Sequence, residues 1–276
     1  MKILIMGSRG MLARVVTKEL DGSCELYKRD TPELDICDKE MVLDDIRETK
    51  PDFVINCAAY TNVDGCEAEK ESAFAVNADG AANIALACKE SGSLLYHIST
   101  DFIFDGRKKS PYVETDEANP LSVYGRSKLE GERQVQSILT RYVIIRTAWL
   151  FGKGGNNFVS TIGKLSEEKD ELKIVNDQFG CPTYALDLAR AIKSLLSIPA
   201  QGIYHFCNAG ICTWYAFGLK VVELMGQKTT VTPVTTREFV RPAVRPAYSV
   251  LDCGKFTAAT GFRIRPWQDA LKEYLS

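Results

Sequence analysis

The sequence predicts a doubly wound α/β fold, in which a parallel sheet is covered by helices on both faces and followed by a smaller C-terminal lobe. Short apolar segments alternate with segments of helical length and periodicity. Several apolar segments lack polar alternation, as strands buried on both faces do. The chain of 276 residues is long enough for one large domain, or for a large domain with a smaller lobe.

The predicted strands are Ile3–Met6, Cys24–Tyr27, Phe53–Cys57, Leu94–Ile98, Tyr142–Ile145 and Leu172–Val175. The predicted helices are Met11–Leu20, Lys39–Thr49, Ser72–Glu90, Val123–Ser137 and Phe158–Glu168. Gly22, Gly92 and the Lys50-Pro51 step stand where helices should end. Because strands and helices alternate, right-handed crossovers and a parallel sheet are expected.

The composition changes near residue 150. Glycine and asparagine dominate residues 152–157, and prolines punctuate the tail at Pro233, Pro242, Pro246 and Pro266. We therefore divide the chain approximately into a first domain, 1–150, and a lobe, 151–276. Segments from the second half are expected to return to the first domain.

Bulk properties exclude several classes of function. A net charge of −2 gives no broad positive field for nucleic acid. No apolar run reaches 18 residues, so no membrane span is expected, and the apolar start is too short for a signal peptide. Nine scattered cysteines without metal spacing indicate reduced thiols in a cytoplasm.

A glycine-rich turn follows the first strand and opens the first helix. Its residues are Gly7, Ser8, Arg9, Gly10, Met11, Leu12 and Ala13, with the spacing G-x-x-G-x-x-A. Gly7 permits a tight turn, Gly10 lets a diphosphate approach the backbone, and Ala13 permits close packing of helix and strand. Free N–H groups at the helix N-terminus would bind the anion. We expect a Rossmann-type dinucleotide site; the alternative is a plain strand–turn–helix.

Tyr124 and Lys128 stand four residues apart on a predicted helix, so both side chains share one face. An ammonium beside a phenol favours the phenolate and lowers its pKa, which would make Tyr124 a usable general acid. Thr100 follows a strand directly, at the sheet edge where ligands bind, and is placed to contact a substrate oxygen. Ser99 is the less favoured alternative, and His97 is interpreted as a packed core residue.

Cofactor choice depends on the end of the second strand, where Lys28, Arg29 and Asp30 follow one another. A basic side chain there accommodates a 2′-phosphate, and an acidic one binds ribose hydroxyls. We expect Arg29 to face the ribose and Asp35 and Ile36 to flank the adenine. This predicts NADPH as the preferred cofactor with measurable use of NADH, unless Asp30 turns inward instead.

Together these residues resemble the extended short-chain dehydrogenase/reductase superfamily and, within it, the dTDP-4-dehydrorhamnose reductase family. The resemblance covers most of the chain. Its markers are residues 56–64, 77–80, 99–106, Tyr124 with Lys128, 146–149, 156–159, 177–183, 210–215 and 241–246. The blocks 177–183 and 241–246 are the more specific to the reductases.

The resemblance implies reduction of the C4 ketone of dTDP-4-dehydro-L-rhamnose to dTDP-L-rhamnose by hydride from NAD(P)H. Residues 1–150 would then bind the cofactor, and residues 151–276 mainly the sugar nucleotide. Tyr124 would protonate the C4 oxygen, Thr100 would steady it, and Lys128 would tune Tyr124 and hold the ribose. The implied cofactor contacts also include Ala58, Ala59, Tyr60 and Asn77, and the implied substrate contacts include Val63, Asp101, Phe102, Trp149 and Asn157.

Arg241 and Arg245 lie in a proline-punctuated segment. They are interpreted as a clamp on the substrate diphosphate, which a guanidinium engages bidentately; the alternative is a stiff surface loop. Two departures from the family pattern are Ala13 in place of glycine, and Phe102 in place of a tyrosine. Some members use magnesium at a dimer interface, but no acidic set maps onto that site, and no metal is predicted. A monomer or homodimer is expected.

Three other readings share the fold. A sugar-nucleotide dehydratase needs Asp-Glu after the threonine, whereas this chain has Asp101 and then Phe102. A sugar-nucleotide epimerase would share Tyr124 and Lys128 but need no net reductant. A non-catalytic regulatory subunit resembling that of methionine adenosyltransferase could keep the same pair as a relic, and turnover would exclude it as the sole role.

Overall fold

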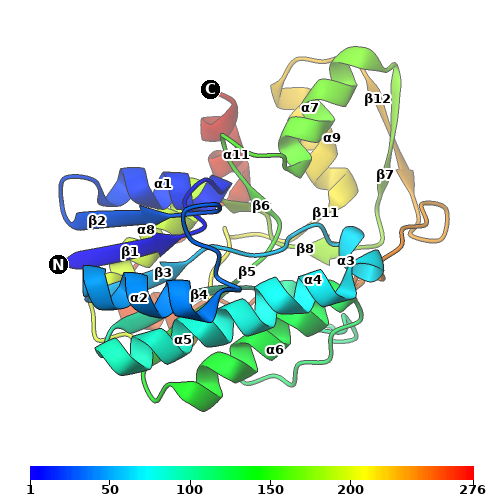
Figure 1. Cartoon of the computed structure of the whole chain (residues 1–276). Helices are drawn as coiled ribbons and strands as arrows, with labels where there is room; N and C mark the ends of the chain where they lie inside the picture. Colours follow the sequence, from blue (N-terminus) through cyan, green and yellow to red (C-terminus); the bar gives the residue numbers. More distant parts are fainter.

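A six-stranded parallel sheet forms the centre of the molecule, and the computed structural model describes residues 1–276 in full (Figure 1). The strands lie in the order β10-β5-β4-β3-β1-β2. Their bounds are β1 Lys2–Met6, β2 Glu25–Arg29, β3 Phe53–Asn56, β4 Leu94–Thr100, β5 Tyr142–Thr147 and β10 Gly202–His205. The chain reverses direction across the sheet between β1 and β3, so the crevice at their carboxyl ends is the expected ligand site.

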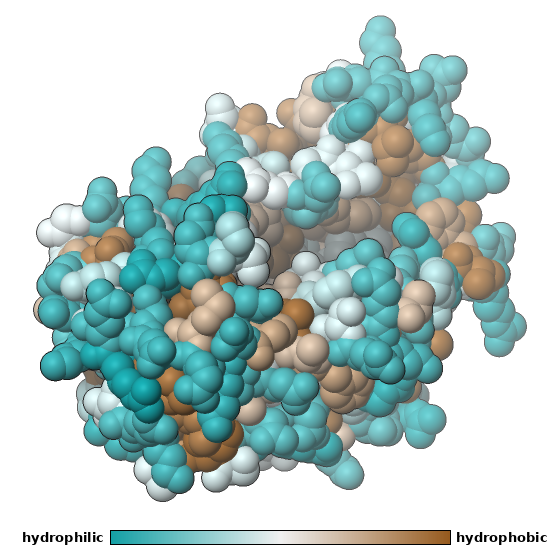
Figure 2. Space-filling model, in the orientation of Figure 1, coloured by the Kyte–Doolittle hydropathy of each residue, from teal (hydrophilic) through white to brown (hydrophobic).

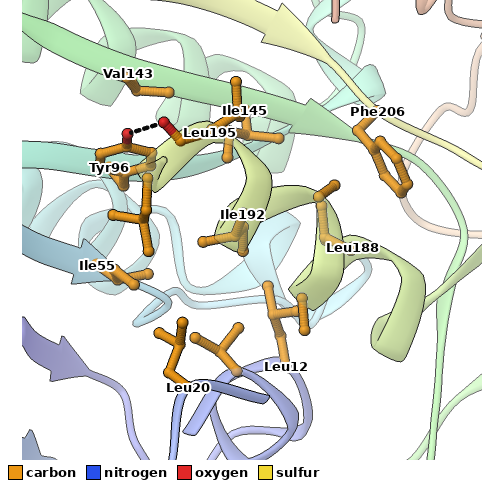
Figure 3. Packing of buried hydrophobic residues seen from close by; sticks show 14 of the residues in the cluster. Leu12, Leu20, Ile55, Tyr96, Val143, Ile145, Leu188, Ile192, Leu195 and Phe206 are labelled. Atoms are coloured by element: carbon orange, nitrogen blue, oxygen red, sulfur yellow. Dashed lines mark hydrogen bonds between the residues drawn. The ribbon is translucent and has the colours of Figure 1, made fainter. Parts of the chain in front are cut away.

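Helices cover both faces of this sheet. One face carries α1 (Met11–Leu20) and α8 (Ala185–Leu196); the other carries α2 (Lys39–Thr49), α5 (Gly80–Ser91) and α6 (Val123–Ile138). Figure 3 shows the apolar core between the sheet and the first pair of helices. There the Tyr96 hydroxyl donates a hydrogen bond to the carbonyl oxygen of Leu195 at 3.0 Å. The doubly wound fold predicted from the sequence is confirmed.

A smaller lobe stands beside the sheet and has its own apolar core around Phe217. It contains α7 (Phe158–Glu168), α9 (Trp214–Leu224) and the parallel pair β7 (Glu171–Val175) and β12 (Thr230–Val234). The remaining elements are α3 Gly65–Ala68, α4 Lys70–Phe74, η1 Ala75–Asp79, η2 Asp101–Ile103, β6 Leu150–Phe151, β8 Phe179–Gly180, β9 Thr183–Tyr184, β11 Cys212–Thr213, α10 Gly254–Thr260 and α11 Trp267–Leu275. No helix combines the length and apolar composition that a membrane span requires.

Two elements differ from the sequence prediction. The strand predicted at 172–175 exists as β7, but it pairs with β12 in the lobe, and the sixth strand of the central sheet is β10. The helix predicted at 72–90 is divided into α4, the π-helical segment η1 and α5. Pairing partners and a local π-turn depend on tertiary contacts, which apolar periodicity does not report.

The π-helical segment η1 sets the position of α6. A side chain at Gly131 of α6 would place its Cβ 2.1 Å from the carbonyl oxygen of Asn77 in η1. Only glycine permits this approach, because no real Cβ contact is that short. The close packing brings the N-terminal half of α6, with Tyr124 and Lys128, to the carboxyl edge of the sheet.

Candidate active site

A cavity of about 320 Å³ opens at the carboxyl ends of β1 and β2. Its wall consists of Gly7, Arg9, Gly10, Asp30, Thr31, Leu34, Asp35, Ile36, Cys57, Ala58, Ala59 and Val76. Gly7 has a φ of +72°, and a Cβ there would lie 2.6 Å from the backbone nitrogen of Ala58. The turn therefore requires glycine both for its conformation and for its contact with the β3 loop.

Nearly half of the predicted cofactor residues meet in this cavity. Its wall includes seven of them, namely Gly7, Arg9, Gly10, Asp35, Ile36, Ala58 and Ala59. Gly10 caps α1, so the free N–H groups of the first helical turn face the glycine loop. Ser8 and Met11 belong to the same turn, whereas Leu12 is buried in the core, so only its backbone can serve a phosphate.

Arg29 does not line the cavity, which corrects the residue expected to face the ribose. Its Nε donates to Asp45 Oδ1 of α2 at 2.6 Å. Asp30 lines the cavity instead, where its carboxylate accepts from the backbone nitrogens of Arg9 at 2.7 Å and Thr31 at 2.9 Å. The strand β2 continues to Arg29, two residues beyond its predicted end at Tyr27, so Arg29 is the last residue of the strand and Asp30 the first residue after it.

Asn77 acts on the cavity wall indirectly. It is buried, and its side chain holds both backbone groups of Tyr60, accepting from the nitrogen at 2.9 Å and donating to the oxygen at 3.1 Å. It also donates to the Ser127 hydroxyl of α6 at 3.0 Å. Asn77 thus joins the loop after β3, which includes Ala58 and Ala59, to the helix that carries Tyr124.

The residues predicted to be catalytic meet at the carboxyl end of β4. Thr100 ends this strand, and its hydroxyl lies close enough to the Tyr124 phenol, in the first turn of α6, to act on the pKa of the phenol. Thr100 Oγ1 also contacts Asp101 Oδ1 at 3.1 Å and accepts from the Phe102 nitrogen at 3.2 Å. The ring of Phe102 meets the Tyr124 ring edge-on, with the centroids 5.6 Å apart. The phenol is therefore fixed by two neighbours.

Burial dominates the electrostatics of Tyr124 and Lys128. It raises the pKa of Tyr124 well above its usual value, although the neighbouring Thr100 acts in the opposite direction. Burial also lowers the pKa of Lys128 to about 8, against the attraction of Glu132. The expectation that Lys128 lowers the pKa of Tyr124 is wrong for this structure, because loss of hydration dominates the shift and Lys128 does not contribute to it. The raised pKa keeps the phenol protonated, as a proton donor must be.

Asp101 and His97 are buried beneath this site. Only 1% of Asp101 is exposed, and burial raises the pKa of its carboxyl group to about 6. Its side chain contacts Thr100, and its role as a substrate contact stays a prediction. His97 is also 1% exposed, and the amide of Asn56 donates to its Nδ1 at 3.2 Å, as expected for a core histidine.

A second cavity of about 400 Å³ lies in the lobe, against α7 and β7. Its wall is mainly apolar and aromatic and includes Phe158, Ile162, Leu165, Leu172, Ile174, Val175, Trp214, Phe239, Val240, Val244, Arg241 and Arg245. Figure 2 shows the hollow between the lobe and the body that contains the central sheet. An apolar wall with few cationic groups suits a flat ring that carries a negatively charged extension.

Trp149 connects the second cavity with the end of β5. Its ring stacks on Trp214, with centroids 3.5 Å apart and planes 9° from parallel. Gly180 leaves room for this ring, because a Cβ there would lie 2.4 Å from it. The φ of Trp149 is +46°, a strained conformation for a bulky residue that is concentrated at functional sites.

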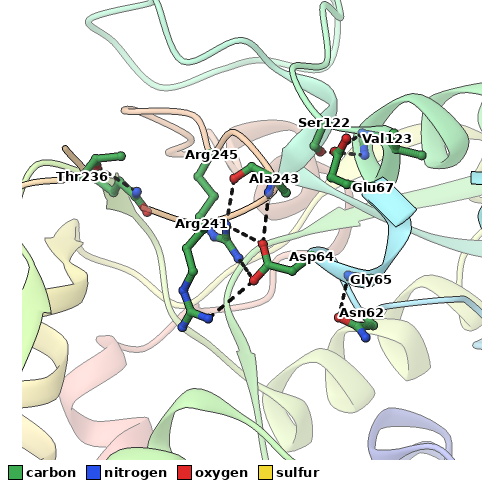
Figure 4. Close-up of polar contacts among 12 residues, drawn as sticks. Asn62, Asp64, Gly65, Glu67, Ser122, Val123, Thr236, Arg241, Ala243 and Arg245 are labelled. Atoms are coloured by element: carbon green, nitrogen blue, oxygen red, sulfur yellow. Dashed lines mark hydrogen bonds and ion pairs between the residues drawn. The ribbon is translucent and has the colours of Figure 1, made fainter. Parts of the chain in front are cut away.

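Arg241 and Arg245 both approach Asp64 of the loop that follows β3 (Figure 4). Arg245 forms a bidentate pair in which both N···O distances are 3.0 Å, whereas the Arg241 pair is longer, at 3.6 Å. Val63, the predicted substrate contact beside Asp64, is half-buried. Asp64 and Trp214 both lie inside or beside blocks that carried the resemblance, yet neither was selected as a site residue from the sequence.

Asn157 has a structural role that the sequence did not indicate. It caps α7 by accepting from the Ser160 nitrogen at 3.1 Å, and its amide donates to the carbonyl oxygens of Gly152 at 2.9 Å and Gly155 at 3.0 Å. Both hydrogens of the Asn157 amide are therefore occupied, and its contact with a sugar nucleotide stays a prediction. No three His, Cys, Asp or Glu side chains converge on a point that could hold a metal ion.

The dinucleotide cavity, the Tyr124–Lys128 pair and the fold define an oxidoreductase of the short-chain dehydrogenase/reductase class. The model of the family described as "RmlD substrate binding domain" matches residues 1–276, and the chain belongs to this family. It is 42% identical to the spore coat polysaccharide biosynthesis protein SpsK of Bacillus subtilis, over 99% of this chain and 96% of the relative.

Two solved structures extend the comparison. A dTDP-4-dehydrorhamnose reductase from Clostridium acetobutylicum superimposes with a TM-score of 0.97 at 45% identity, covering 100% of this chain and 98% of that one. A dTDP-4-dehydrorhamnose reductase from Bacillus anthracis in complex with NADP gives a TM-score of 0.97 at 37% identity, covering 99% and 98%. The family resemblance inferred from the sequence is confirmed.

Proposed function

We propose that this chain reduces the C4 ketone of dTDP-4-dehydro-L-rhamnose to dTDP-L-rhamnose with NADPH, and that it also accepts NADH. The observation that carries the proposal is the position of Tyr124 beside Thr100 at the carboxyl end of β4, in a chain that also has a dinucleotide cavity and a second cavity suited to a nucleotide. Full-length similarity to dTDP-4-dehydrorhamnose reductases supports the substrate, and the relative in complex with NADP supports the cofactor.

The first cavity fits a dinucleotide. A Cβ at Gly7 would fill the space against Ala58, and the N-terminus of α1 supplies free N–H groups for a diphosphate. Arg9, Asp30 and Asp35 place a cation and two carboxylates around the ribose region. The bound cofactor supplies the hydride that reaches C4.

Tyr124 donates its proton to the C4 oxygen, which becomes the hydroxyl of the product. The phenol is protonated beforehand because burial raises its pKa. Thr100 and the ring of Phe102 orient it towards the substrate, and Thr100 steadies the same oxygen. Lys128 uses one of its three N–H donors on the Ile98 carbonyl, and the other two are available for the ribose.

The second cavity would take the nucleotide end of the substrate. Phe158 and Trp214 provide aromatic surfaces for a base, and Arg241 provides a cation for the diphosphate. Trp149, stacked on Trp214, would border the sugar. In this proposal residues 1–150, with α8 and β10, hold the cofactor, and most of 151–276 holds the substrate. The protein would act as a monomer or homodimer in the cytoplasm, where its nine free thiols stay reduced.

Oxidation of NADPH with dTDP-4-dehydro-L-rhamnose, compared with GDP- and UDP-linked keto sugars, tests the proposal. Fast oxidation with the dTDP-linked sugar alone is expected. An epimerase would convert its sugar without net oxidation of NADPH. A regulatory subunit would show no turnover with any of the sugars and would instead co-purify with a synthetase. Preference for a GDP- or UDP-linked sugar would reject the proposed substrate while retaining the reductase chemistry.

A further inference from the structure

The loop formed by residues 236–245 closes one side of the second cavity and is attached at two points. At its start, Asp177 of the lobe accepts from the Thr236 nitrogen at 2.9 Å. At its end, Asp64 accepts from the Ala243 nitrogen at 3.2 Å and from both terminal nitrogens of Arg245 at 3.0 Å. Asp64 belongs to the loop after β3, so this second attachment joins the lobe to the cofactor-binding part of the chain.

The two arginines of this loop are held differently. Arg245 is 21% exposed, and its Nη1 donates both to Asp64 and to the Ala243 carbonyl oxygen at 2.9 Å, which closes a ring of bonds. Arg241 is 52% exposed, contacts Asp64 only at 3.6 Å, and lies over the ring of Phe239 at 4.9 Å. Most donors of Arg241 are therefore free, whereas the main donors of Arg245 are occupied.

We propose that Asp64 is a positioning residue for nucleotide binding: it ties Arg245 and Ala243 to the cofactor-binding part of the chain and so holds the 236–245 loop across the second cavity. Arg241 is then the cation left to engage the diphosphate. One carboxylate between two guanidinium groups leaves the cluster with a net positive charge, as an anion site requires. The inference rests on the proposed function in assigning a thymidine nucleotide to this cavity.

The test is calorimetric binding of thymidine diphosphate to the full chain saturated with NADP⁺. Asp64→Asn and Arg241→Ala are each expected to raise the Kd about tenfold, the scale on which lost charge-assisted bonds and misplaced groups act. The double variant should raise the Kd by less than the product of the two single increases, because both substitutions act on the contact between Arg241 and the diphosphate. Asp64→Glu keeps the charge and should recover part of the affinity.

Asp187→Asn is the matched control, because Asp187 also pairs with two arginines, Arg265 at 2.8 Å and Arg190 at 3.6 Å, outside the second cavity. It should leave the Kd unchanged even where it lowers the melting temperature. Tighter binding by Asp64→Asn would show that Asp64 competes with the diphosphate and would overturn the inference. An unchanged Kd would overturn it as well.

Hydrogen exchange separates the inference from the proposed function. In the chain without nucleotide, Asp64→Asn should accelerate exchange at the Ala243 amide and in the peptides that cover 236–245. The reason is that the variant weakens both the acceptor of the Ala243 amide and the ion pair that holds Arg245. If the unmodified chain fails to bind thymidine diphosphate, the proposed substrate is rejected. If hydrogen exchange in Asp64→Asn is unchanged, the inference that Asp64 holds the 236–245 loop is rejected, whatever the substrate is.

Discussion

The Nζ atom of Lys128 donates a hydrogen bond to the backbone carbonyl oxygen of Ile98 at 2.7 Å. Ile98 lies in β4 and Lys128 in α6, so the bond fixes the ammonium beside the carboxyl end of β4, whose last residue is Thr100. Only 2% of Lys128 is exposed, and one carbonyl cannot replace the water that it loses. This explains why the pKa of Lys128 falls to about 8.

Lys128→Met should therefore weaken both catalysis and cofactor binding. We expect turnover to fall by about 10²-fold or more, as for loss of an acid–base participant, together with a higher KM for NADPH. In the unmodified enzyme, kcat/KM for NADPH should decline as pH rises through about 8, because the ammonium is lost above the lowered pKa. Steady-state rates between pH 6 and 9.5 measure both effects. A variant with normal KM for NADPH would contradict the role given to the ammonium.

Tyr124→Phe removes the proton donor and keeps the ring that packs edge-on against Phe102. Turnover is expected to fall by about 10²-fold or more, while the Kd for NADPH stays nearly constant. Single-turnover kinetics and fluorescence titration of NADPH measure the two quantities separately. Near-normal turnover in this variant would show that another group protonates the substrate.

The sequence placed candidate site residues near one another where the signal was local. The glycine turn, the Tyr124–Lys128 spacing and Thr100 at a strand end each depend on a few adjacent residues, and the structure brings them to one edge of the sheet. Arg29 was assigned wrongly because its guanidinium pairs with Asp45 of α2, a contact between separate elements that the sequence around the end of β2 does not indicate.

Long-range relationships could not be predicted in the same way. Asp64 and Arg245 are 181 residues apart, and nothing in one sequence shows that they form a pair. The same holds for β10, which pairs with β5 across the lobe segments between them. Asn157 shows a different limit: a residue in a family motif can be retained for its cap of α7, and the sequence does not distinguish that role from contact with the ligand.

Cofactor selection should depend on Arg9 more than on Arg29. The Arg9 side chain lines the first cavity, is 58% exposed and pairs only with the equally exposed Glu33, so it can turn to a 2′-phosphate. Arg9→Ala should raise the KM for NADPH about tenfold, the effect of one charge-assisted bond, with little change for NADH. Arg29→Ala should leave the NADPH-to-NADH ratio unchanged, since its guanidinium is held by Asp45. An equal rise of the KM for NADPH and the KM for NADH in Arg9→Ala would refute a contact between Arg9 and the 2′-phosphate.

Acid stability should depend on His205, which is fully buried in β10. Its Nδ1 lies 3.0 Å from the Tyr112 carbonyl oxygen and its Nε2 lies 3.4 Å from Arg146 Nη1, so the neutral ring donates to one and accepts from the other. Burial, reinforced by the Arg146 charge, lowers the pKa of His205 to about 3. Below pH 6.5 the unfolded chain therefore binds a proton on this histidine and the folded chain does not. The free energy of unfolding consequently decreases as the pH is lowered.

From pH 7 to pH 5 this one group should cost about 2 kcal/mol of unfolding free energy, since one pKa unit corresponds to about 1.4 kcal/mol. Asp101 acts in the opposite direction between pH 4 and 6, because its pKa is raised to about 6. His205→Gln removes the histidine contribution and leaves that of Asp101. Urea unfolding of both proteins at pH 7 and pH 5 should show a smaller loss for the variant. Equal losses would mean that His205 is protonated without penalty in the folded chain.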